Sequence, residues 1–346
     1  MDEKVKLAII GCGAIAKQYH MPVLKSIDEC SVVAVCDLIP ERAEYAASFF
    51  GISRERVFTD AAELLKIEEI QGVVILTPNY NHCEMTELAA IHKKHVFCTK
   101  PMARSVEECQ RMIDACEKNN VQLFISFMHR YLNGIEEAKR LIETNYIGDI
   151  QMVRVLNAPG ATSTVSKWFY KKENVGGGCV MDIGVHGIDL VRYLIGDISR
   201  VLYADIGCFR SVIESGGEKI CPDNEDHAAV MYQTESGALV DQMISWHHWT
   251  TADRFSMEIF GSQGTILLRG TMGQMVVAKV KPGQGAKWVS QEVAYNPLGD
   301  RQHRDFINMI KSGSSADPDG YEGLACVKVA KAVYRAAEIK SVVEVK

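Results

Sequence analysis

The sequence predicts an α/β protein with two domains: an N-terminal Rossmann-type doubly wound parallel sheet and a C-terminal α+β domain with a large, mostly antiparallel, open-faced sheet. Three observations support this. The 346 residues amount to roughly two typical domains. Strand and helix patterns alternate up to residue 127, as they do in parallel sheets. Strand-like runs dominate beyond residue 196. We therefore expect a dinucleotide-binding domain at 1–127 and a substrate-binding and oligomerisation domain at 128–346.

The first half alternates short buried runs with helical patterns. Strands are expected at 5–10, 31–36, 72–76, 95–98 and 121–127, and helices up to 27 and at 60–66, 81–93 and 105–119. Ser105 and Glu108 have the spacing of a capping box at the start of the last helix.

The second half begins with a helix and a strand and then changes character. Helices are expected at 133–145, 183–195, 301–311 and 321–339, and strands at 151–156, 200–209, 227–233, 238–246, 255–260, 265–269, 275–280 and 287–293. A sheet with helices on only one face leaves a surface to be covered. We expect a homodimer or homotetramer formed through this sheet.

Composition narrows the class of partner and the compartment. A net charge of −6, without long blocks of one sign, does not indicate a nucleic-acid or membrane surface, so small solutes are the expected partners. The eleven cysteines form no C-x-x-C pair, and no apolar run reaches the ~20 residues of a membrane span. We expect a reduced, soluble, cytoplasmic protein without a structural metal.

A glycine-rich turn after the first strand predicts a dinucleotide site. In G-C-G-A-I-A, Gly11 permits the tight turn and Gly13 lets a pyrophosphate approach the backbone, while the helix N-terminus at Ala14 and Ile15 binds the phosphates. The next strand ends in Asp37, placed to bond the ribose hydroxyls of an adenosine. This carboxylate would repel a 2′-phosphate, which favours NAD. Arg42, five residues on, leaves NADP open.

Polar residues follow three other strands of the first half, where ligands of doubly wound sheets bind. Most are expected at the cofactor: Thr77, Pro78, Asn79, His82, Lys100, Pro101 and Arg130. Lys100, between a strand end and a proline, is also placed to hold a substrate hydroxyl. His129 is expected at the substrate.

The stretch G-G-G-C-V-M-D-I-G-V-H-G-I-D at 176–189 is predicted to contain the catalytic acid/base residues. Asp182, His186 and Asp189 lie at i, i+4 and i+7, on one face of a helix. A carboxylate beside an imidazole is a usable acid/base pair, because it fixes the ring tautomer. Alternatively, Asp182 caps the helix, Asp189 is solvated and His186 satisfies a buried hydrogen bond. A third interpretation makes the three residues metal ligands of a hydrolase or lyase.

Further residues are expected to line a substrate site: Asn157, Trp168, Asp189, Trp246 and His247. The pair His247-His248 does not predict a metal site, since adjacent strand residues point to opposite faces.

Four segments together resemble the glucose-fructose oxidoreductase, inositol dehydrogenase and rhizopine-catabolism (Gfo/Idh/MocA) family. They are I-I-G-C-G-A-I-A, V-V-I-L-T-P-N-Y-N-H, K-H-V-F-C-T-K-P and G-G-G-C-V-M-D-I-G-V-H-G-I-D-L. The resemblance implies that Lys100, Asp182 and His186 are the catalytic set and that the Lys100-Pro101 peptide is cis. The family usually has Glu where this chain has Thr99, which affects contacts to the nicotinamide.

The leading hypothesis is hydride transfer between NAD(P) and a secondary hydroxyl or ketone of a sugar, sugar derivative or cyclitol. His186 takes the hydroxyl proton, Asp182 orients it, and Lys100 stabilises the alkoxide. Alternatives are a tightly bound NAD used internally for sugar–sugar oxidoreduction or glycoside cleavage, the metal-dependent hydrolase or lyase, and a redox-inactive NAD-binding protein.

Overall fold

The computed structural model describes residues 3–158, 167–210, 212–215, 218–246, 255–269, 274–281, 285–292 and 300–346. The chain forms two compact units. The first comprises Met1–Met128 and Pro297–Leu324, and the second comprises His129–Asn296 and Ala325–Lys346. The predicted domains were 1–127 and 128–346. The observed division differs from them mainly because residues 297–324 belong to the first unit.

Helix α9 (Asp300–Ser312) shows why that late segment belongs to the first unit. Its buried side chains Phe306 and His303 pack against the ring of Phe97, with ring centroids 5.5 and 4.9 Å away. His303 Nε2 also lies 3.0 Å from Nδ1 of buried His20. The amphipathic pattern of α9 predicts burial, but it does not identify the core that receives the apolar face.

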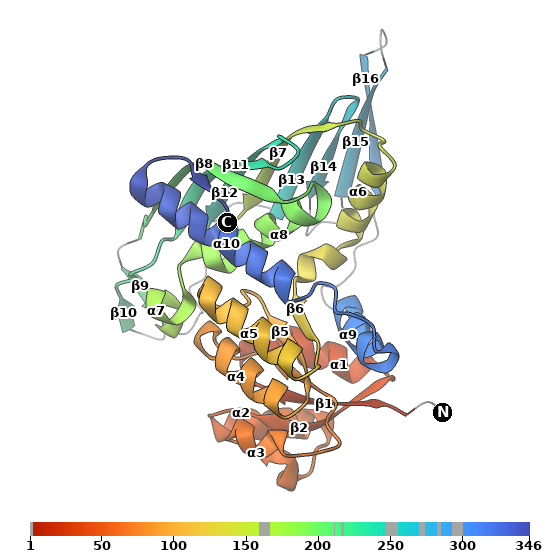
Figure 1. Ribbon diagram of the computed structural model, residues 1–346, viewed down its shortest axis with the longest axis vertical. Coiled ribbons are helices and arrows are strands. Elements are labelled where there is room, and N and C mark those ends of the chain that lie inside the picture. Colours follow the sequence, from red (N-terminus) through yellow and green to blue (C-terminus); the bar gives the residue numbers. More distant parts are fainter. Residues whose placement is uncertain are drawn as a thin grey trace. The chain divides into compact units, whose positions relative to one another are not determined.

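The first unit is a doubly wound parallel sheet, as predicted. Its strands are β1 (Val5–Ile10), β2 (Cys30–Cys36), β3 (Val57–Phe58), β4 (Gly72–Ile75), β5 (His95–Thr99) and β6 (Leu123–Ser126). They are ordered β3-β2-β1-β4-β5-β6, and all neighbouring pairs are parallel. Figure 1 draws these strands and the helices between them in red to yellow. The order reverses between β1 and β4, and such a reversal places a ligand crevice at the carboxyl ends of the strands.

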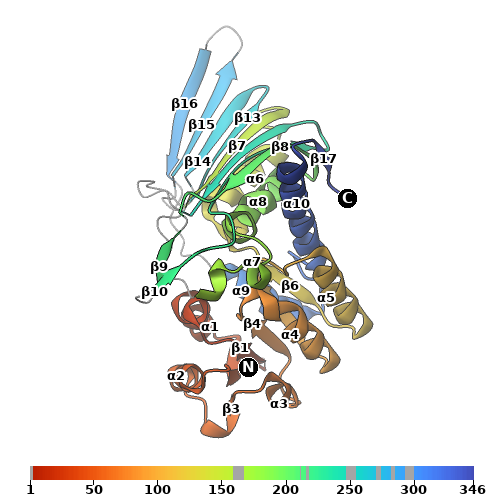
Figure 2. The same cartoon turned by 90° about the vertical axis from the view of Figure 1, so that its left-hand side faces the viewer.

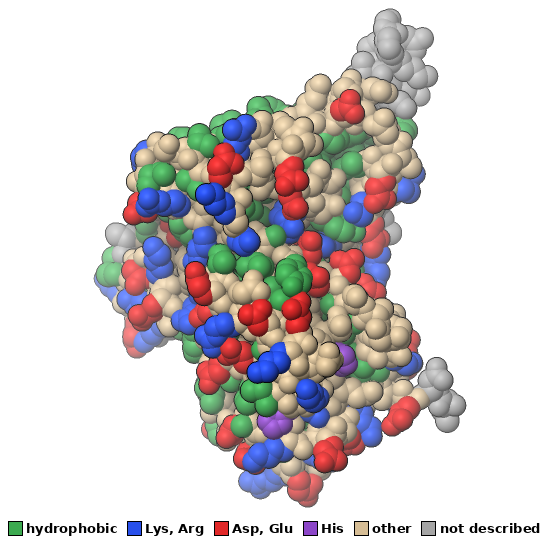
Figure 3. All heavy atoms as spheres, in the orientation of Figure 1, with side chains coloured by type: hydrophobic (Ala, Val, Ile, Leu, Met, Phe, Trp, Pro, Cys, Tyr) green, Lys and Arg blue, Asp and Glu red, His purple; other side chains and the backbone are tan. Residues whose placement is uncertain are grey.

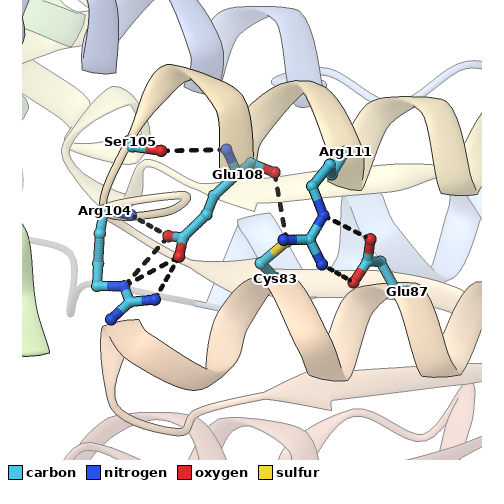
Figure 4. A network of polar contacts seen from close by, with 6 residues as sticks. All are labelled: Cys83, Glu87, Arg104, Ser105, Glu108 and Arg111. Atoms are coloured by element: carbon cyan, nitrogen blue, oxygen red, sulfur yellow. Dashed lines mark hydrogen bonds and ion pairs between the residues drawn. The ribbon is translucent and has the colours of Figure 1, made fainter.

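The helices that flank this sheet are α1 (Met21–Ser26), α2 (Pro40–Phe50), α3 (Ala61–Leu65), α4 (Asn79–Ile91) and α5 (Val106–Lys118). A π-helical turn at Ala16–His20 comes directly before α1. Figure 4 shows the contacts that join α4 to α5. Arg111 of α5 forms an ion pair with Glu87 of α4. At the start of α5, Ser105 Oγ accepts a hydrogen bond from Glu108 N at 3.2 Å, the expected half of the capping box. The Glu108 carboxylate, however, accepts from Arg104 N and from the Arg104 guanidinium, because that cation competes for it.

The second unit contains a nine-stranded sheet. Its strands are β7 (Ile150–Asn157), β8 (Ile198–Gly207), β11 (His227–Thr234), β12 (Leu239–Ser245), β13 (Phe255–Gly261), β14 (Gly264–Arg269), β15 (Gln274–Lys281), β16 (Gly285–Glu292) and β17 (Val343–Glu344). Their order is β16-β15-β14-β13-β7-β12-β11-β8-β17, and only β7 and β12 pair in parallel. A mostly antiparallel sheet is therefore confirmed.

Helices α6 (Asn133–Glu143), α8 (Val185–Leu194) and α10 (Gly320–Ile339) lie on one side of this sheet (Figure 2). Strand side chains that face them, such as Val153 and Val155 of β7 and Val240 of β12, are buried. The second unit also contains a short helix, α7 (Lys172–Val175), and a hairpin of β9 (Ile213–Ser215) and β10 (Glu218–Ile220).

Two properties bear on the sequence-based expectations. All eleven cysteines lie in described segments and all are free thiols. Among the described helices, none combines the length and the apolar character needed to cross a bilayer.

Candidate active site

The two glycines of the nucleotide turn have different surroundings. Gly11 has a φ of +95°, and a Cβ there would lie 2.7 Å from the backbone carbon of Leu76. A Cβ on Gly13 would meet no protein heavy atom within 4 Å. The protein's own packing therefore requires glycine at position 11 but not at 13. The open space at Gly13 fits a cofactor phosphate that approaches the backbone. Ala16 is fully buried, as expected of the close helix–sheet contact.

Asp37 lies directly after β2, beside this turn. Its Oδ2 accepts a hydrogen bond from Cys12 N at 2.7 Å, and its Oδ1 accepts one from Ile39 N at 2.9 Å. Leu38, the next residue, is 81% exposed, so an apolar side chain adjoins the acid. Carboxylate and apolar surface together fit the ribose and adenine of NAD. Burial, and to a smaller extent the Asp37 carboxylate, raises the pKa of the Cys12 thiol to about 12, so this thiol stays protonated at neutral pH.

The turn after β4 contributes a buried hydroxyl. Thr77 Oγ1 is buried, and the described part of the chain offers it no hydrogen-bond partner. An orphaned hydroxyl at this edge of the sheet fits a ligand that would complete it. Pro78 caps α4 and Asn79 begins it.

His82 was expected at the cofactor, but its ring is buried within the first unit. Nε2 lies 2.9 Å from the Thr77 carbonyl oxygen and Nδ1 lies 3.0 Å from that of Pro101. Burial lowers the pKa of this imidazole. The ring therefore connects the turn after β4 to the turn after β5, which is a supporting role.

Lys100 follows β5 directly and is half-buried. Its peptide bond to Pro101 is cis, as the resemblance implied. Strand β5 lies two places from β1 in a parallel sheet, so Lys100 and Gly13 both follow strand ends at the same edge of the first unit. Thr99, the departure from the family pattern, places its hydroxyl 3.4 Å from the carbonyl oxygen of Ile75.

In the second unit, a π-helical turn at Val180–Gly184 leads into α8. Asp182 lies in this turn and not in the regular α-helix that the sequence predicts. Asp182 Oδ2 accepts a hydrogen bond from Trp246 Nε1 at 3.0 Å. Asp189 is fully buried and forms an ion pair with Arg130, whose Nε lies 2.9 Å from Oδ1. Arg130 and Asp189 were expected at the cofactor and the substrate. Each instead neutralises the other inside the second unit.

His186 is buried and stacks on His129, with ring centroids 4.0 Å apart and planes 24° apart. His129 lies on the 3-10 turn Met128–Tyr131, which also contains Arg130. Two adjacent contacts, His129 on His186 and Arg130 on Asp189, thus fasten this turn to α8. Sequence reasoning did not anticipate that the two histidines meet.

Asn157 was expected at the substrate, but it is buried beneath α8. Its Oδ1 accepts from Gln242 Nε2 at 2.8 Å, and the same nitrogen donates to the Gly184 carbonyl at 2.9 Å. A Cβ on Gly187 would overlap both amide side chains. The glycine after His186 therefore lets the helix approach this buried polar network, which accounts for Asn157 structurally.

The predicted aromatic residues form one cluster. Phe169 lies between its neighbour Trp168 and Trp246, with ring centroids 5.7 and 5.1 Å away. Trp246 is only 1% exposed, so it supports Asp182 rather than presenting a face to substrate. Trp168 is half-buried and is still a candidate for lining the substrate site. His247, with His248 and Trp249, lies outside the described residues.

Sequence reasoning missed three consecutive polar residues immediately before β11, Asn224, Glu225 and Asp226, all of which are buried. Asn224 Nδ2 donates to the carbonyls of Phe169 and Gly177. A run of amide and carboxylate side chains just before a strand was the available signal. No group of three His, Cys, Asp or Glu side chains in the described segments is arranged to hold a metal ion.

Comparison with known proteins gives matches to two family models. Residues 5–127 match the family described as "Oxidoreductase family, NAD-binding Rossmann fold", and residues 135–267 match the "GFO/IDH/MocA C-terminal domain". The chain is 26% identical to a myo-inositol 2-dehydrogenase of Thermotoga maritima over 97% of both chains. It is 28% identical to a D-apiose dehydrogenase of Paraburkholderia graminis, over 99% of this chain and 90% of that protein.

Among solved structures, a levoglucosan dehydrogenase in complex with NADH superposes with a TM-score of 0.89 at 24% identity, covering 99% of this chain and 100% of the other. This likeness concerns the fold. Because the two family matches together span more than half of its length, this chain belongs to the GFO/IDH/MocA family of oxidoreductases, with an NAD-binding Rossmann fold in residues 5–127.

Proposed function

We propose that this protein uses NAD to oxidise a secondary hydroxyl of a sugar, sugar derivative or cyclitol, and catalyses the reverse reduction. The names of its relatives, which include inositol, apiose and levoglucosan dehydrogenases, support this substrate class. One structural observation carries the proposal. A glycine with open space above it, Gly13, and a lysine, Lys100, both follow strands at the same edge of one parallel sheet.

The residues proposed to hold the cofactor surround that edge. Gly13, Ala14 and Ile15 offer backbone and a helix N-terminus to the phosphates, Asp37 bonds the ribose, and Thr77 Oγ1 completes its hydrogen bonding on the ligand. When bound, NAD accepts the hydride of the substrate. The Asp37 carboxylate would repel a 2′-phosphate, which favours NAD over NADP, and Arg42 is the cation that could offset this repulsion.

Three side chains of the protein are proposed to move or stabilise charge. The His186 imidazole takes the hydroxyl proton as general base. Asp182, one turn earlier and held by Trp246, supplies the negative charge that favours the resulting imidazolium. The Lys100 ammonium stabilises the developing alkoxide.

A panel of sugars, amino sugars, uronates and inositols, assayed for reduced nicotinamide with NAD and with NADP, tests the proposal. We expect turnover with at least one polyol and a higher kcat/KM with NAD. Binding of NAD without turnover on the whole panel would favour a redox-inactive protein. Activity that a chelator abolishes and a metal restores would favour the hydrolase or lyase. NAD that stays bound through gel filtration during turnover would indicate internal recycling.

We also propose a cytoplasmic homo-oligomer, formed when the sheet of the second unit packs against a second copy. Large apolar side chains are exposed where they alternate with buried residues along the strands: Tyr203, Met243, Met152, Met231 and Leu239. No helix of the described residues covers the face of the sheet opposite α6, α8 and α10 (Figure 2). A monomeric mass by light scattering at assay concentration would contradict the proposed oligomer.

Acidic and basic side chains are interspersed on the face drawn in Figure 3, which does not suit a polyanion.

A further inference from the structure

The glycine run before the π-helical turn of the second unit is in contact with two buried side chains. A Cβ on Gly177 would overlap the hydroxyl of Tyr334, and a Cβ on Gly178 would overlap the backbone oxygen of Glu225. These glycines are therefore required by close protein packing. The glycine run makes room for Glu225 and Tyr334.

Glu225 accepts hydrogen bonds from the backbone N–H groups at the start of this turn. Its Oε1 lies 2.9 Å from Gly178 N and 3.1 Å from Val180 N, while its backbone oxygen accepts from Cys179 N at 2.9 Å. Three successive N–H groups thus bind one residue. A helix start leaves such N–H groups without intrahelical partners, and a carboxylate satisfies them and favours the helix dipole.

Tyr334 of α10 fixes that carboxylate from the other side. Its hydroxyl donates to Glu225 Oε1 at 2.7 Å and accepts from Gly178 N at 3.2 Å. Both side chains are removed from water, and burial raises the pKa of each. Charge-assisted hydrogen bonds among buried groups hold geometry strongly, because no water competes for them.

The same segment also holds the tryptophan that contacts Asp182. Trp246 N donates to the Asp226 backbone oxygen at 2.9 Å, and Trp246 Nε1 donates to Asp182 Oδ2 at 3.0 Å. Asp182 N in turn donates to the Gly178 oxygen at 3.0 Å. The contacts form a closed ring from Glu225 through the glycine turn to Asp182, and back through Trp246 to Asp226.

We propose that Glu225 and Tyr334 are positioning residues that fix the Asp182 carboxylate for the reaction. They act through the glycine turn at one end and through Trp246 at the other. The inference rests on the proposed function, in which Asp182 supports His186. Both residues belong to the second unit, whereas the nucleotide turn belongs to the first, so we expect their loss to change turnover and not NAD affinity.

The test compares Tyr334→Phe and Glu225→Gln with the wild-type protein. In both variants we expect kcat to fall by about ten- to hundredfold, the size of a small misplacement in an active site, with KM for NAD unchanged. The emission of Trp246, isolated by subtracting the spectrum of the matching Trp246→Phe variant, is expected to shift. A merely structural role would not move this signal at a temperature where the protein is folded.

Tyr321→Phe is the matched control. It removes a hydroxyl from the same helix that also donates to a glutamate, Glu117, at 2.7 Å, and we expect wild-type kcat. Asp182→Asn separates the two levels of the proposal. If Asp182→Asn loses turnover while Tyr334→Phe and Glu225→Gln keep wild-type kcat and Trp246 emission, the positioning role is wrong and the proposed function stands. If Asp182→Asn itself keeps wild-type turnover, the role proposed for Asp182 fails and the positioning role fails with it. Absence of turnover by the wild-type protein on the whole panel would instead contradict the proposed function.

Discussion

The nucleotide turn offers a prediction with two matched substitutions, Gly13→Ala and Gly11→Ala. A methyl group on Gly13 meets no protein atom within 4 Å. Stability should therefore be kept, or rise by about 0.4–1 kcal/mol through the loss of unfolded-state entropy. The same methyl group occupies the space proposed for the pyrophosphate. If overpacking there costs about 1–3 kcal/mol, the Kd for NAD rises about 5- to 150-fold.

Gly11→Ala should behave in the opposite way. Its φ of +95° strains an alanine by about 1–2 kcal/mol. Its Cβ also lies 2.7 Å from the Leu76 backbone carbon, which adds about 1–3 kcal/mol of overpacking. A total of about 2–5 kcal/mol corresponds to a fall in Tm of roughly 4 °C or more.

The assays are thermal unfolding for stability and titration of NAD by intrinsic fluorescence for affinity. The expected pattern is weak binding with intact stability for Gly13→Ala and reduced stability for Gly11→Ala. Unchanged NAD affinity in Gly13→Ala would refute the assignment of this open space to the cofactor. A loss of stability equal to that of Gly11→Ala would refute the packing reasoning.

Three further predictions concern charge. Burial, and to a smaller extent His303, hold the pKa of His20 well below 6.5, so the unfolded state binds a proton that the folded state does not. Stability is therefore full above pH about 6.5 and falls below it by up to ~1.4 kcal/mol per pH unit, a slope that urea unfolding should show and His20→Asn should reduce. Asp37→Ser should raise kcat/KM with NADP relative to NAD, measured with the substrate found in the panel. Asp189→Asn removes the negative charge from the buried ion pair with Arg130, so unfolding free energy should fall by about 3–5 kcal/mol, and the double change Arg130→Met with Asp189→Leu should restore part of it.

The sequence predicted the long elements well, because their signals are local. Strand β1 has the predicted bounds Val5–Ile10, and α10 begins within one residue of its predicted start. The short strands β3, β9, β10 and β17 were not predicted. Two or three residues carry too little periodicity, and their pairing depends on distant strands.

The site was predicted in its residue types and less well in its contacts. Spacing placed Asp182, His186 and Asp189 on one helical face, but a π-helical turn and three different partners separate their roles. The partner of Asp189 lies 59 positions away, and no local pattern encodes such a pair. The same limit explains why Glu225, whose contacts are all distant in sequence, was missed.

In the proposed reaction, Lys100 and His186 act on the same substrate. The most direct measurement is kcat of Lys100→Met and of His186→Ala at saturating NAD, beside the Kd for NAD. We predict that each variant loses about two orders of magnitude or more in kcat while it binds NAD as the wild type does. Near-wild-type kcat in either variant would contradict the account.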